Sequence, residues 1–282
     1  MAYEVTIVSA FFDIGRGKWG GKIGNHAIPG WLVRSNETYL DRFTDLAPLQ
    51  NQMIIFTQAA FAEAIFEIRR SHNLDDLTSV VVCDELFGPT GLLADRVDLL
   101  RSRMRVELHN FVLDAGCPEY WNADYVMLNA LKSVFVCTAI RLKLIRCSQA
   151  AWVDFGYCRD NRRFEPGGAW RFDCGDRMNL FYIRAPDERP IFDIVRTGDV
   201  YFQGCHIVGP VGYWPRFSEL IDEAIVSLLK CGLVDDDQTA LLMAYRRTPG
   251  LFRIHAVDPS DWFVLFRNFG WLGDTTSVPV AA

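Results

Sequence analysis

Apolar and polar residues along the first half of the chain alternate between two patterns. Short, β-rich apolar runs predict buried strands at residues 5–10, 53–56, 79–83 and 150–153. Apolar residues at helical spacing predict helices between these runs, at residues 35–46, 57–70 and 123–145. Strands that alternate with helices in this order predict a mostly parallel central sheet with helices on both faces, which is a Rossmann-type α/β fold.

The pattern is less regular after residue 160. Short apolar runs there predict strands at residues 180–183, 191–195, 200–202 and 251–254. Helical spacing predicts helices at residues 217–229 and 240–245, and residues 164–175 have the composition of a loop. Because the sequence contains no internal repeat and no linker, we expect one domain, residues 1–282, with halves at 1–160 and 161–282.

Composition narrows the class of protein. Half of the 282 residues are hydrophobic, so the chain can bury a large core and is too apolar for a disordered protein. A net charge of -6 argues against nucleic acid as the main partner, because nucleic-acid-binding proteins usually carry a basic face. The eight cysteines are scattered, with no C-x-x-C pair, as expected for reduced, buried thiols.

The chain shows no sign of export or of membrane insertion. Its start lacks a charged segment followed by an apolar run and a small-residue cleavage site. No run reaches the roughly 18 apolar residues that a spanning helix needs. We therefore expect a cytoplasmic protein, and peripheral contact with the inner face of the membrane stays open.

Asp154 is the first candidate site residue. It follows the predicted buried strand at residues 150–153, in an acidic turn that contains Gly156. Open α/β sheets usually place their ligands at the carboxyl ends of the strands. A carboxylate there can hold Mg²⁺ or Mn²⁺, since both cations prefer oxygen ligands and commonly bridge to phosphates. The alternative is that Asp154 only forms the turn, as aspartate commonly does.

A second acidic cluster, Asp235-Asp236-Asp237-Gln238, stands directly before a predicted helix. Acidic residues at a helix N-terminus are favoured by capping and by the helix dipole, so one or two of them need no function. Three in a row exceed what capping requires, and their mutual repulsion predicts a raised pKa for at least one carboxyl group. We place Asp237 and Gln238 in the cleft.

Several other polar residues are weaker candidates. Asn129 and Lys132 are three positions apart and share a helix face, so Lys132 can reach a phosphate or, alternatively, extend its ammonium into water. Arg16 lies in a glycine-containing loop after the first strand, but the rest of a dinucleotide-binding fingerprint is absent. His206 and His255 are isolated histidines, which are more often structural than ligands.

Five motifs occur in order along nearly the whole chain, from residue 6 to about residue 263. They are T-I-V-S-A-F-F-D-I-G-R-G, Y-L-D-R-F-x-x-L-A-P-L-Q-N-Q-M-I-I-F-T, L-N-A-L-K-S-V-F-V, W-V-D-F-G-Y-C-R and L-V-D-D-D-Q-T. Together they resemble the HtrL/YibB family of bacterial proteins. Members of that family are similar to GT-A nucleotide-sugar glycosyltransferases and are associated with surface-polysaccharide assembly.

The resemblance implies a GT-A-like fold and a role for each candidate. Residues 1–160 would form the nucleotide-binding half and residues 161–282 the acceptor and sugar half. The implied nucleotide-binding residues are Ser9, Phe11, Asp13, Arg16, Thr57, Asn129, Lys132, Trp152, Val153 and Asp154. The implied sugar-binding residues are Gly156, Gly204 and His206, and the implied catalytic residues are Asp236, Asp237 and Gln238.

The metal assignment departs from the family pattern. The segment Asp154-Phe155-Gly156 stands where GT-A enzymes carry a D-x-D motif, and Gly156 replaces its second acidic residue. Asp154 and His255 are the expected ligands of a Mn²⁺ or Mg²⁺ ion, which would neutralise the leaving nucleoside diphosphate.

The resemblance implies a glycosyltransferase that moves a sugar from a nucleotide-sugar donor to a surface glycan or a lipid-linked acceptor, with retention of configuration favoured. Two alternatives remain open at this stage. One is a non-catalytic nucleotide-sugar- or glycan-binding protein of polysaccharide assembly. The other is a nucleotidyltransferase or phosphotransferase that uses the same elements.

Overall fold

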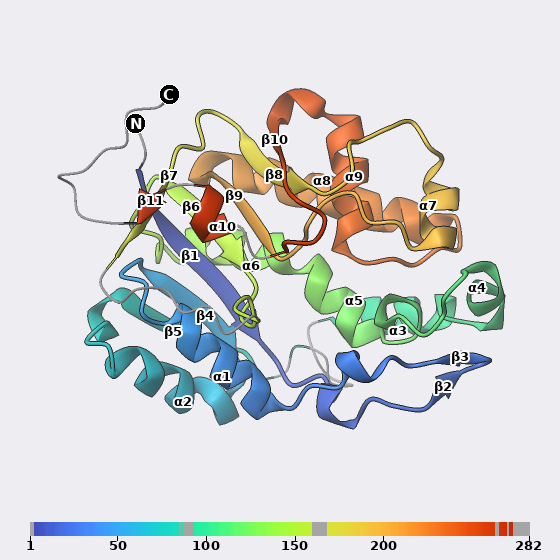
Figure 1. Ribbon diagram of the computed structural model, residues 1–282, viewed down its shortest axis with the longest axis horizontal. Coiled ribbons are helices and arrows are strands. Elements are labelled where there is room, and N and C mark those ends of the chain that lie inside the picture. Colours follow the sequence, from blue (N-terminus) through green and yellow to red (C-terminus); the bar gives the residue numbers. More distant parts are fainter. Residues whose placement is uncertain are drawn as a thin grey trace.

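The computed structural model describes residues 3–84, 86, 93–159, 168–262, 265–269 and 271–272. Their centre is a sheet with the strand order β10-β8-β9-β6-β1-β4-β5 (Figure 1). These strands are β1 (Tyr3–Phe11), β4 (Met53–Thr57), β5 (Thr78–Val82), β6 (Gln149–Val153), β8 (Met178–Tyr182), β9 (His206–Pro210) and β10 (Phe252–Ala256). Two short strands, β7 (Trp170–Phe172) and β11 (Trp271–Leu272), extend the sheet from the start of β1.

Strand directions confirm the predicted mostly parallel sheet. β1 is parallel to both of its neighbours, β4 and β6, and β4 is parallel to β5. β9 is antiparallel to β6 and to β8, and β8 and β10 are parallel to each other. One sheet therefore joins both halves of the chain into the predicted single α/β domain.

The order of connections creates a switch point beside β1. From β1 the chain builds outward through β4 to β5 and then returns to place β6 on the other side of β1. In open α/β sheets the crossovers diverge at such a point, and a crevice opens outside the carboxyl ends of the two central strands.

Both faces of the central strands are buried, which explains their continuous apolar sequence. Along β1, Ile7 and Phe11 pack into the core on one face, and Val8 and Ala10 pack into the core on the other. Side chains of a strand alternate between faces, so a strand covered on both sides is mainly apolar, and the buried polar residues of β1, Thr6 and Ser9, are small.

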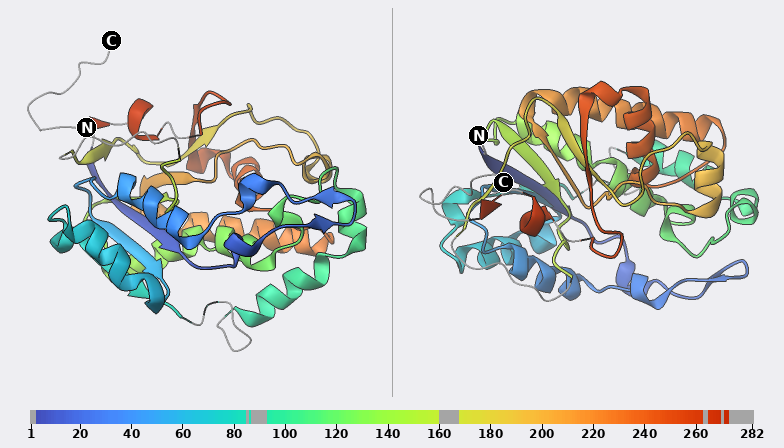
Figure 2. Two further views of the ribbon diagram at one scale, coloured as in Figure 1. Left: turned by 60° about the horizontal axis from the view of Figure 1, so that its bottom comes forward. Right: turned by 45° about the horizontal axis from the view of Figure 1, so that its top comes forward.

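Helices cover both faces, as the sequence predicts (Figure 2). One core contains side chains of α1 (Asn36–Leu46), α2 (Ala59–Arg70) and α10 (Leu265–Asn268). The other contains side chains of α3 (Ala94–Arg103), α4 (Val106–Phe111), α5 (Ala123–Ala130), α6 (Lys132–Arg141), α7 (Ile191–Thr197), α8 (Trp214–Lys230) and α9 (Asp237–Arg247). A hairpin of β2 (Lys22–Ile23) and β3 (His26–Ala27) projects away from the sheet (Figure 1).

Four sequence-based element predictions are wrong. Within the predicted loop at residues 164–175, residues 170–172 form the strand β7. Residues 123–145 form two helices, α5 and α6, which meet at Leu131 and are bent by 46°. Residues 191–195 form α7 rather than a strand, because Pro190 precedes the helix and Gly198, at φ 65°, ends it. The predicted strand at residues 200–202 is reduced to one bridge between Tyr182 and Phe202.

No single helix of the described residues has the length and apolar composition needed to cross a membrane. The bent pair α5 and α6 passes the same test when the two helices are taken together. Val126, Met127, Phe135 and Val136 of this pair are buried in the core of the protein.

A buried arginine fixes α2 and the chain after α1 against the sheet. The guanidinium of Arg69 donates to the carbonyl oxygens of Ala47 and Leu49 at 2.6 Å and to that of Asn51 at 2.9 Å. It also donates to the hydroxyl of Thr78 at the start of β5, at 2.9 Å. Because Arg69 is fully buried, these carbonyl groups have no access to water as an alternative donor.

We therefore predict that Arg69→Met lowers the free energy of unfolding by about 3 kcal/mol or more, since several buried carbonyl groups lose their donor. Arg70→Met is the matched control, because Arg70 is exposed and its contacts, an ion pair with Glu67 and a ring contact with Phe66, lie on its own helix. It should cost less than about 0.5 kcal/mol. Urea unfolding of both variants measures the difference, and equal costs would show that the buried arginine does not hold this corner of the fold.

Candidate functional site

A cavity of about 600 Å³ opens at the carboxyl ends of β1 and β6. Its wall includes Phe11 and Asp13 at the end of β1, and Trp152 and Asp154 at the end of β6. The cavity therefore lies at the switch point of the sheet, where α/β proteins of this topology bind their ligands.

Lys132, the first residue of α6, joins the two halves of the sheet beneath this cavity. Its ammonium donates to Asp237 Oδ2 at 2.8 Å and to the carbonyl oxygen of Gly204 at 2.9 Å. It also forms an ion pair with Asp154 Oδ1 at 3.2 Å. An ammonium has three protons, and these contacts occupy all three. Lys132 is 5% exposed, so the prediction that it extends into water is wrong.

The charges around Lys132 explain why a buried ammonium is stable there. Burial alone would lower the pKa of Lys132, but Asp154 and Asp237 outweigh burial and raise it. The pKa of Asp154 is lowered, because Lys132 and Arg159 together outweigh its burial. Trp152 Nε1 adds a hydrogen bond to Asp154 Oδ1 at 2.9 Å. Asp237 keeps a raised pKa, since its burial exceeds the effect of Lys132.

The acidic cluster before α9 divides into structural and cavity-facing residues. Asp235 accepts from the backbone of Asp236 and from the hydroxyl of Thr239, and Asp236 caps the helix by accepting from the backbone of Gln238 at 2.9 Å. Asp236 and Gln238 line the cavity, whereas Asp237 is directed to Lys132. The capping interpretation is therefore confirmed for Asp236, the N-cap residue of α9.

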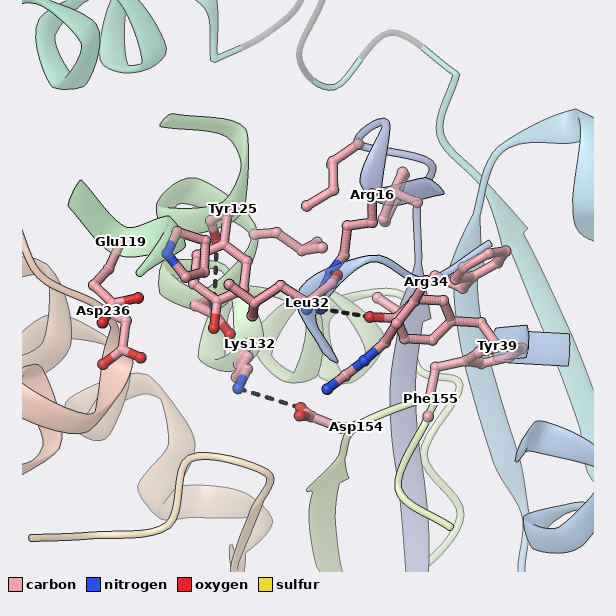
Figure 3. A pocket seen from close by; sticks show the side chains of 18 of the residues that line it. Arg16, Leu32, Arg34, Tyr39, Glu119, Tyr125, Lys132, Asp154, Phe155 and Asp236 are labelled. Carbon is pink, nitrogen blue, oxygen red and sulfur yellow. Dashed lines mark hydrogen bonds and ion pairs between the residues drawn. The ribbon is translucent and has the colours of Figure 1, made fainter. Parts of the chain in front are cut away.

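Glu119 lies beside Asp236 on the same side of the cavity (Figure 3). Burial, and then the charge of Asp235, raise the pKa of Glu119 to about 8. Burial likewise raises the pKa of Asp235 to about 6 and that of Asp236 well above its ordinary value. This agrees with the pKa increase predicted for the cluster. We call Glu119 and Asp236 the acidic wall.

The opposite side of the cavity is basic (Figure 3). Arg16 comes from the short helix η1 (Arg16–Lys18) after β1, Arg34 from the loop after η2 (Gly30–Leu32), and Arg159 from the turn after β6. Burial, and then repulsion from Arg159, lower the pKa of Arg34 to about 10. We call these three arginines the basic wall.

Tyr39 of α1 contacts both Arg16 of the basic wall and Gly156 of the turn after β6. Its hydroxyl accepts a hydrogen bond of 2.5 Å from Arg16 Nη1. Its ring lies against Gly156, where a Cβ atom would come within 2.8 Å of the ring carbon Cδ1. The packing of Tyr39 therefore explains why glycine stands where D-x-D motifs carry their second carboxylate.

The predicted divalent-cation site can be tested against the residues present. Asp154 Oδ1 already accepts from Trp152 and pairs with Lys132, and Gly156 offers no carboxylate. Among the described residues, no group of three histidine, cysteine, aspartate or glutamate side chains is arranged to hold a metal ion. His255 lies on β10, bonded to Asn179 Oδ1 at 2.9 Å. The described residues thus do not fit a divalent cation at Asp154.

The structure brings most, but not all, of the predicted site residues to the cavity. Those that line it are Phe11, Asp13, Arg16, Asn129, Lys132, Trp152, Asp154, Gly156, Asp236 and Gln238. Those that do not line it are Ser9, Thr57, Val153, Gly204, His206, Asp237 and His255. Gly204 and Asp237 lie behind Lys132, which binds both.

The other predicted site residues that do not line the cavity are buried in the sheet or held by hydrogen bonds within the fold. Thr57 donates to the carbonyl oxygen of Phe11 at 2.7 Å, and Ser9 and Val153 are buried within the sheet. His206 is fully buried between the rings of Phe181 and Tyr157, and burial lowers its pKa to about 3.

Several cavity residues were not predicted as ligand-binding residues. Arg34, Tyr39, Glu119 and Tyr125 all line the cavity. A glutamate in the otherwise apolar segment C-P-E-Y-W is the one unusual sequence feature among them. Tyr39 and Tyr125 fit the apolar periodicity of their helices. From the sequence alone they therefore look like core residues, and their place in the cavity wall cannot be predicted.

The fold and the cavity define an α/β protein of the Rossmann type, with a ligand crevice at the switch point of its sheet. The chain belongs to the family described as "Bacterial protein of unknown function (HtrL_YibB)", which matches residues 3–270. It is 32% identical over 274 residues to "Protein HtrL" of Escherichia coli (strain K12), covering 95% of this chain and 93% of that protein.

A solved structure titled "PaToxG Glycosyltransferase" is a much more distant neighbour. The two share 10% sequence identity, and the match covers 88% of this chain and 71% of that one, with a TM-score of 0.35. This degree of structural similarity is too low to support a conclusion about function.

We predict that Lys132→Met lowers the free energy of unfolding by about 3–5 kcal/mol, because Asp154 and Asp237 then lose the cation between them. Arg96→Met is the control, since Arg96 pairs with Asp222 on the surface and should cost about 1 kcal/mol or less. Chemical denaturation of both variants at pH 7 gives the comparison. A cost for Lys132→Met no larger than for the control would contradict a central role for this ion pair.

Glu119 gives the folded protein a pH dependence of defined sign. Its raised pKa means that the folded state keeps this proton up to about pH 8, whereas the unfolded chain releases it near its ordinary value. Glu119 therefore makes stability fall as pH rises between about 4 and 8. Glu119→Gln mimics the protonated form and removes this loss.

We expect Glu119→Gln to melt close to the wild-type temperature near pH 5 and about 5 °C or more above it at pH 8. Glu107→Gln is the matched control, since Glu107 is exposed on α4. Thermal unfolding across this pH range measures the effect. If the two variants followed the same profile, Glu119 would not be the group that titrates.

Proposed function

We propose that this protein is a glycosyltransferase that moves a sugar from a nucleotide-sugar donor to a surface glycan or lipid-linked acceptor. One observation carries the proposal: the cavity at the switch point of the sheet has a basic wall that faces an acidic wall. A nucleotide sugar has the matching polarity, because a dianionic diphosphate lies next to an uncharged sugar rich in hydroxyl groups.

The basic wall would bind the diphosphate of the donor. Guanidinium groups present several N–H donors in a planar arrangement that matches phosphate oxygens. The sugar would then lie toward Asp236 and Gln238, whose side chains can accept hydrogen bonds from its hydroxyl groups.

The transfer breaks the bond between the anomeric carbon and the phosphate oxygen, and the electron pair leaves with the nucleoside diphosphate. A bond forms between the anomeric carbon and the acceptor oxygen, which gives up its proton to a base. Positive charge develops on the sugar ring as the first bond breaks, and a nearby carboxylate stabilises it.

Asp236 is the carboxylate that we assign to this role. Asp237 is held by Lys132 behind the cavity wall, whereas Asp236 lines the cavity. A carboxylate with a raised pKa is also a stronger base for the acceptor proton once it is ionised. We favour retention of configuration at the anomeric carbon. Determining the anomeric configuration of the product distinguishes retention from inversion.

The test begins with calorimetric titration of the folded protein with UDP, GDP, CDP and their sugars, followed by a transfer assay with the donor that binds. Asp236→Asn should lower turnover roughly 100-fold or more and change donor affinity little. Asparagine caps helices as well as aspartate does, so this variant should fold normally. Asp222→Asn, at an exposed position on α8, is the control and should keep full turnover.

The outcomes separate the alternatives. Failure of every nucleotide and nucleotide sugar to bind the folded protein would reject the proposal. Binding without turnover would favour a nucleotide-sugar-binding protein of polysaccharide assembly. Transfer of a phosphoryl or nucleotidyl group instead of a sugar would assign the protein to the other enzyme class.

A further inference from the structure

The cation nearest to Asp154 is not available to a ligand. The ammonium of Lys132 already contacts Asp154, Asp237 and the carbonyl oxygen of Gly204. Its single positive charge is also matched by two carboxylates, so the group as a whole is negative. A diphosphate that enters the cavity must therefore be neutralised by other residues.

Tyr39 leaves no room for a carboxylate side chain at position 156, in the turn after β6. A Cβ atom on Gly156 would lie 2.8 Å and 2.9 Å from two carbon atoms of the Tyr39 ring, which is closer than real Cβ contacts. The same tyrosine accepts a hydrogen bond from Arg16. One side chain thus excludes a metal-binding carboxylate and holds a guanidinium group in the cavity wall.

Arg16 and Arg34 are cations whose hydrogen bonds go to neutral groups. Arg16 donates to Tyr39 Oη and to the carbonyl oxygen of Leu32, and Arg34 donates to the carbonyl oxygen of Trp31. Neither arginine forms an ion pair with a carboxylate within the part of the chain that the structure describes.

The guanidinium of Arg16 is also fixed in position by aromatic rings. Its central carbon lies 4.8 Å from the ring centre of Trp19 and 5.7 Å from that of Tyr125. Such stacking holds the planar group without using its N–H donors. The remaining donors of Arg16 are therefore available to an anion, and the side chain loses little freedom on binding one.

We propose that Arg16 and Arg34, beside Arg159, bind the diphosphate of the donor in place of a divalent cation, so that donor binding requires no metal ion. The inference rests on the proposed function, because it concerns the donor of that same reaction. It assigns to the basic wall the charge neutralisation that a Mn²⁺ or Mg²⁺ ion would otherwise supply.

The test measures affinity with and without metal. UDP, GDP, CDP and inorganic pyrophosphate are titrated into the protein, first in EDTA and then in buffer with Mn²⁺. We expect the nucleoside diphosphate that binds to have dissociation constants within about threefold of each other in the two buffers. We also expect affinity to fall with rising salt, since the contacts are between ionic groups that solvent still reaches.

Arg16→Gln and Arg34→Gln should each weaken this binding in EDTA by roughly tenfold to a hundredfold, the effect of losing a hydrogen bond between charged groups. Arg216→Gln is the matched control, since Arg216 pairs with Glu219 and Glu223 on the outer face of α8 and should bind as the wild type does. Circular dichroism and thermal unfolding verify that each variant is folded.

The outcomes distinguish this inference from the function on which it rests. Binding that needs Mn²⁺ and survives both arginine substitutions would overturn the inference and leave the glycosyltransferase proposal standing. Absence of nucleotide binding in both buffers would overturn the two together. Metal-independent binding that is lost in folded Arg16→Gln and Arg34→Gln, and kept in Arg216→Gln, is the supporting result.

Discussion

The ion-pair group around Lys132 is the interaction on which the cavity depends. One ammonium contacts the end of β6 through Asp154, the segment before β9 through Gly204, and the start of α9 through Asp237. These three segments belong to different parts of the chain, and each delivers a residue to the carboxyl edge of the sheet. A buried cation between two carboxylates is stable only if all its partners are in place. The cavity floor is therefore built by a set of contacts that form together, and Gly204 is part of that set, because a Cβ there would lie 2.2 Å from Asp237 Oδ2.

Above this floor, the two walls of the cavity carry opposite charges, because they are formed by different segments of the chain. The segments that follow β1 and β6 carry the arginines, and the segments before α5 and α9 carry Glu119 and Asp236. Opposite charges that could neutralise each other are thus held on different walls, with the ion-pair group of Lys132 between them (Figure 3). Burial is the largest cause of the raised pKa values of Glu119 and Asp235 and of the lowered pKa of Arg34, and like charges nearby add to each shift. Groups with such perturbed pKa values gather at functional sites more often than elsewhere in proteins.

Local sequence patterns were sufficient to predict the strands of the sheet, but they did not predict the contacts that form the walls of the cavity. Apolar runs located β1, β4, β5 and β6, since strands of a central sheet carry mainly apolar residues, and Ser35 marked the start of α1 by accepting from Thr38. The break at Leu131 could not be found in this way, because apolar residues continue through it without proline or glycine. Yet that break makes Lys132 a helix start and directs it to Asp237. The contacts of Tyr39 with Arg16 and Gly156 likewise join positions far apart in sequence, which no local pattern records.

The glycine at position 156, where the resemblance to GT-A enzymes would place a second carboxylate, fits its surroundings. A carboxylate at position 156 would need the space that the Tyr39 ring fills, and it would stand beside the arginines of the basic wall. Removing Tyr39 to make room would take one hydrogen bond from the guanidinium of Arg16. Asp154, for its part, already balances part of the Lys132 charge, so a divalent cation bound to it would compete with an ammonium only 3.2 Å away. The residues at this edge of the sheet therefore form one consistent arrangement, and it is on this arrangement that the proposed metal-free binding of the donor rests.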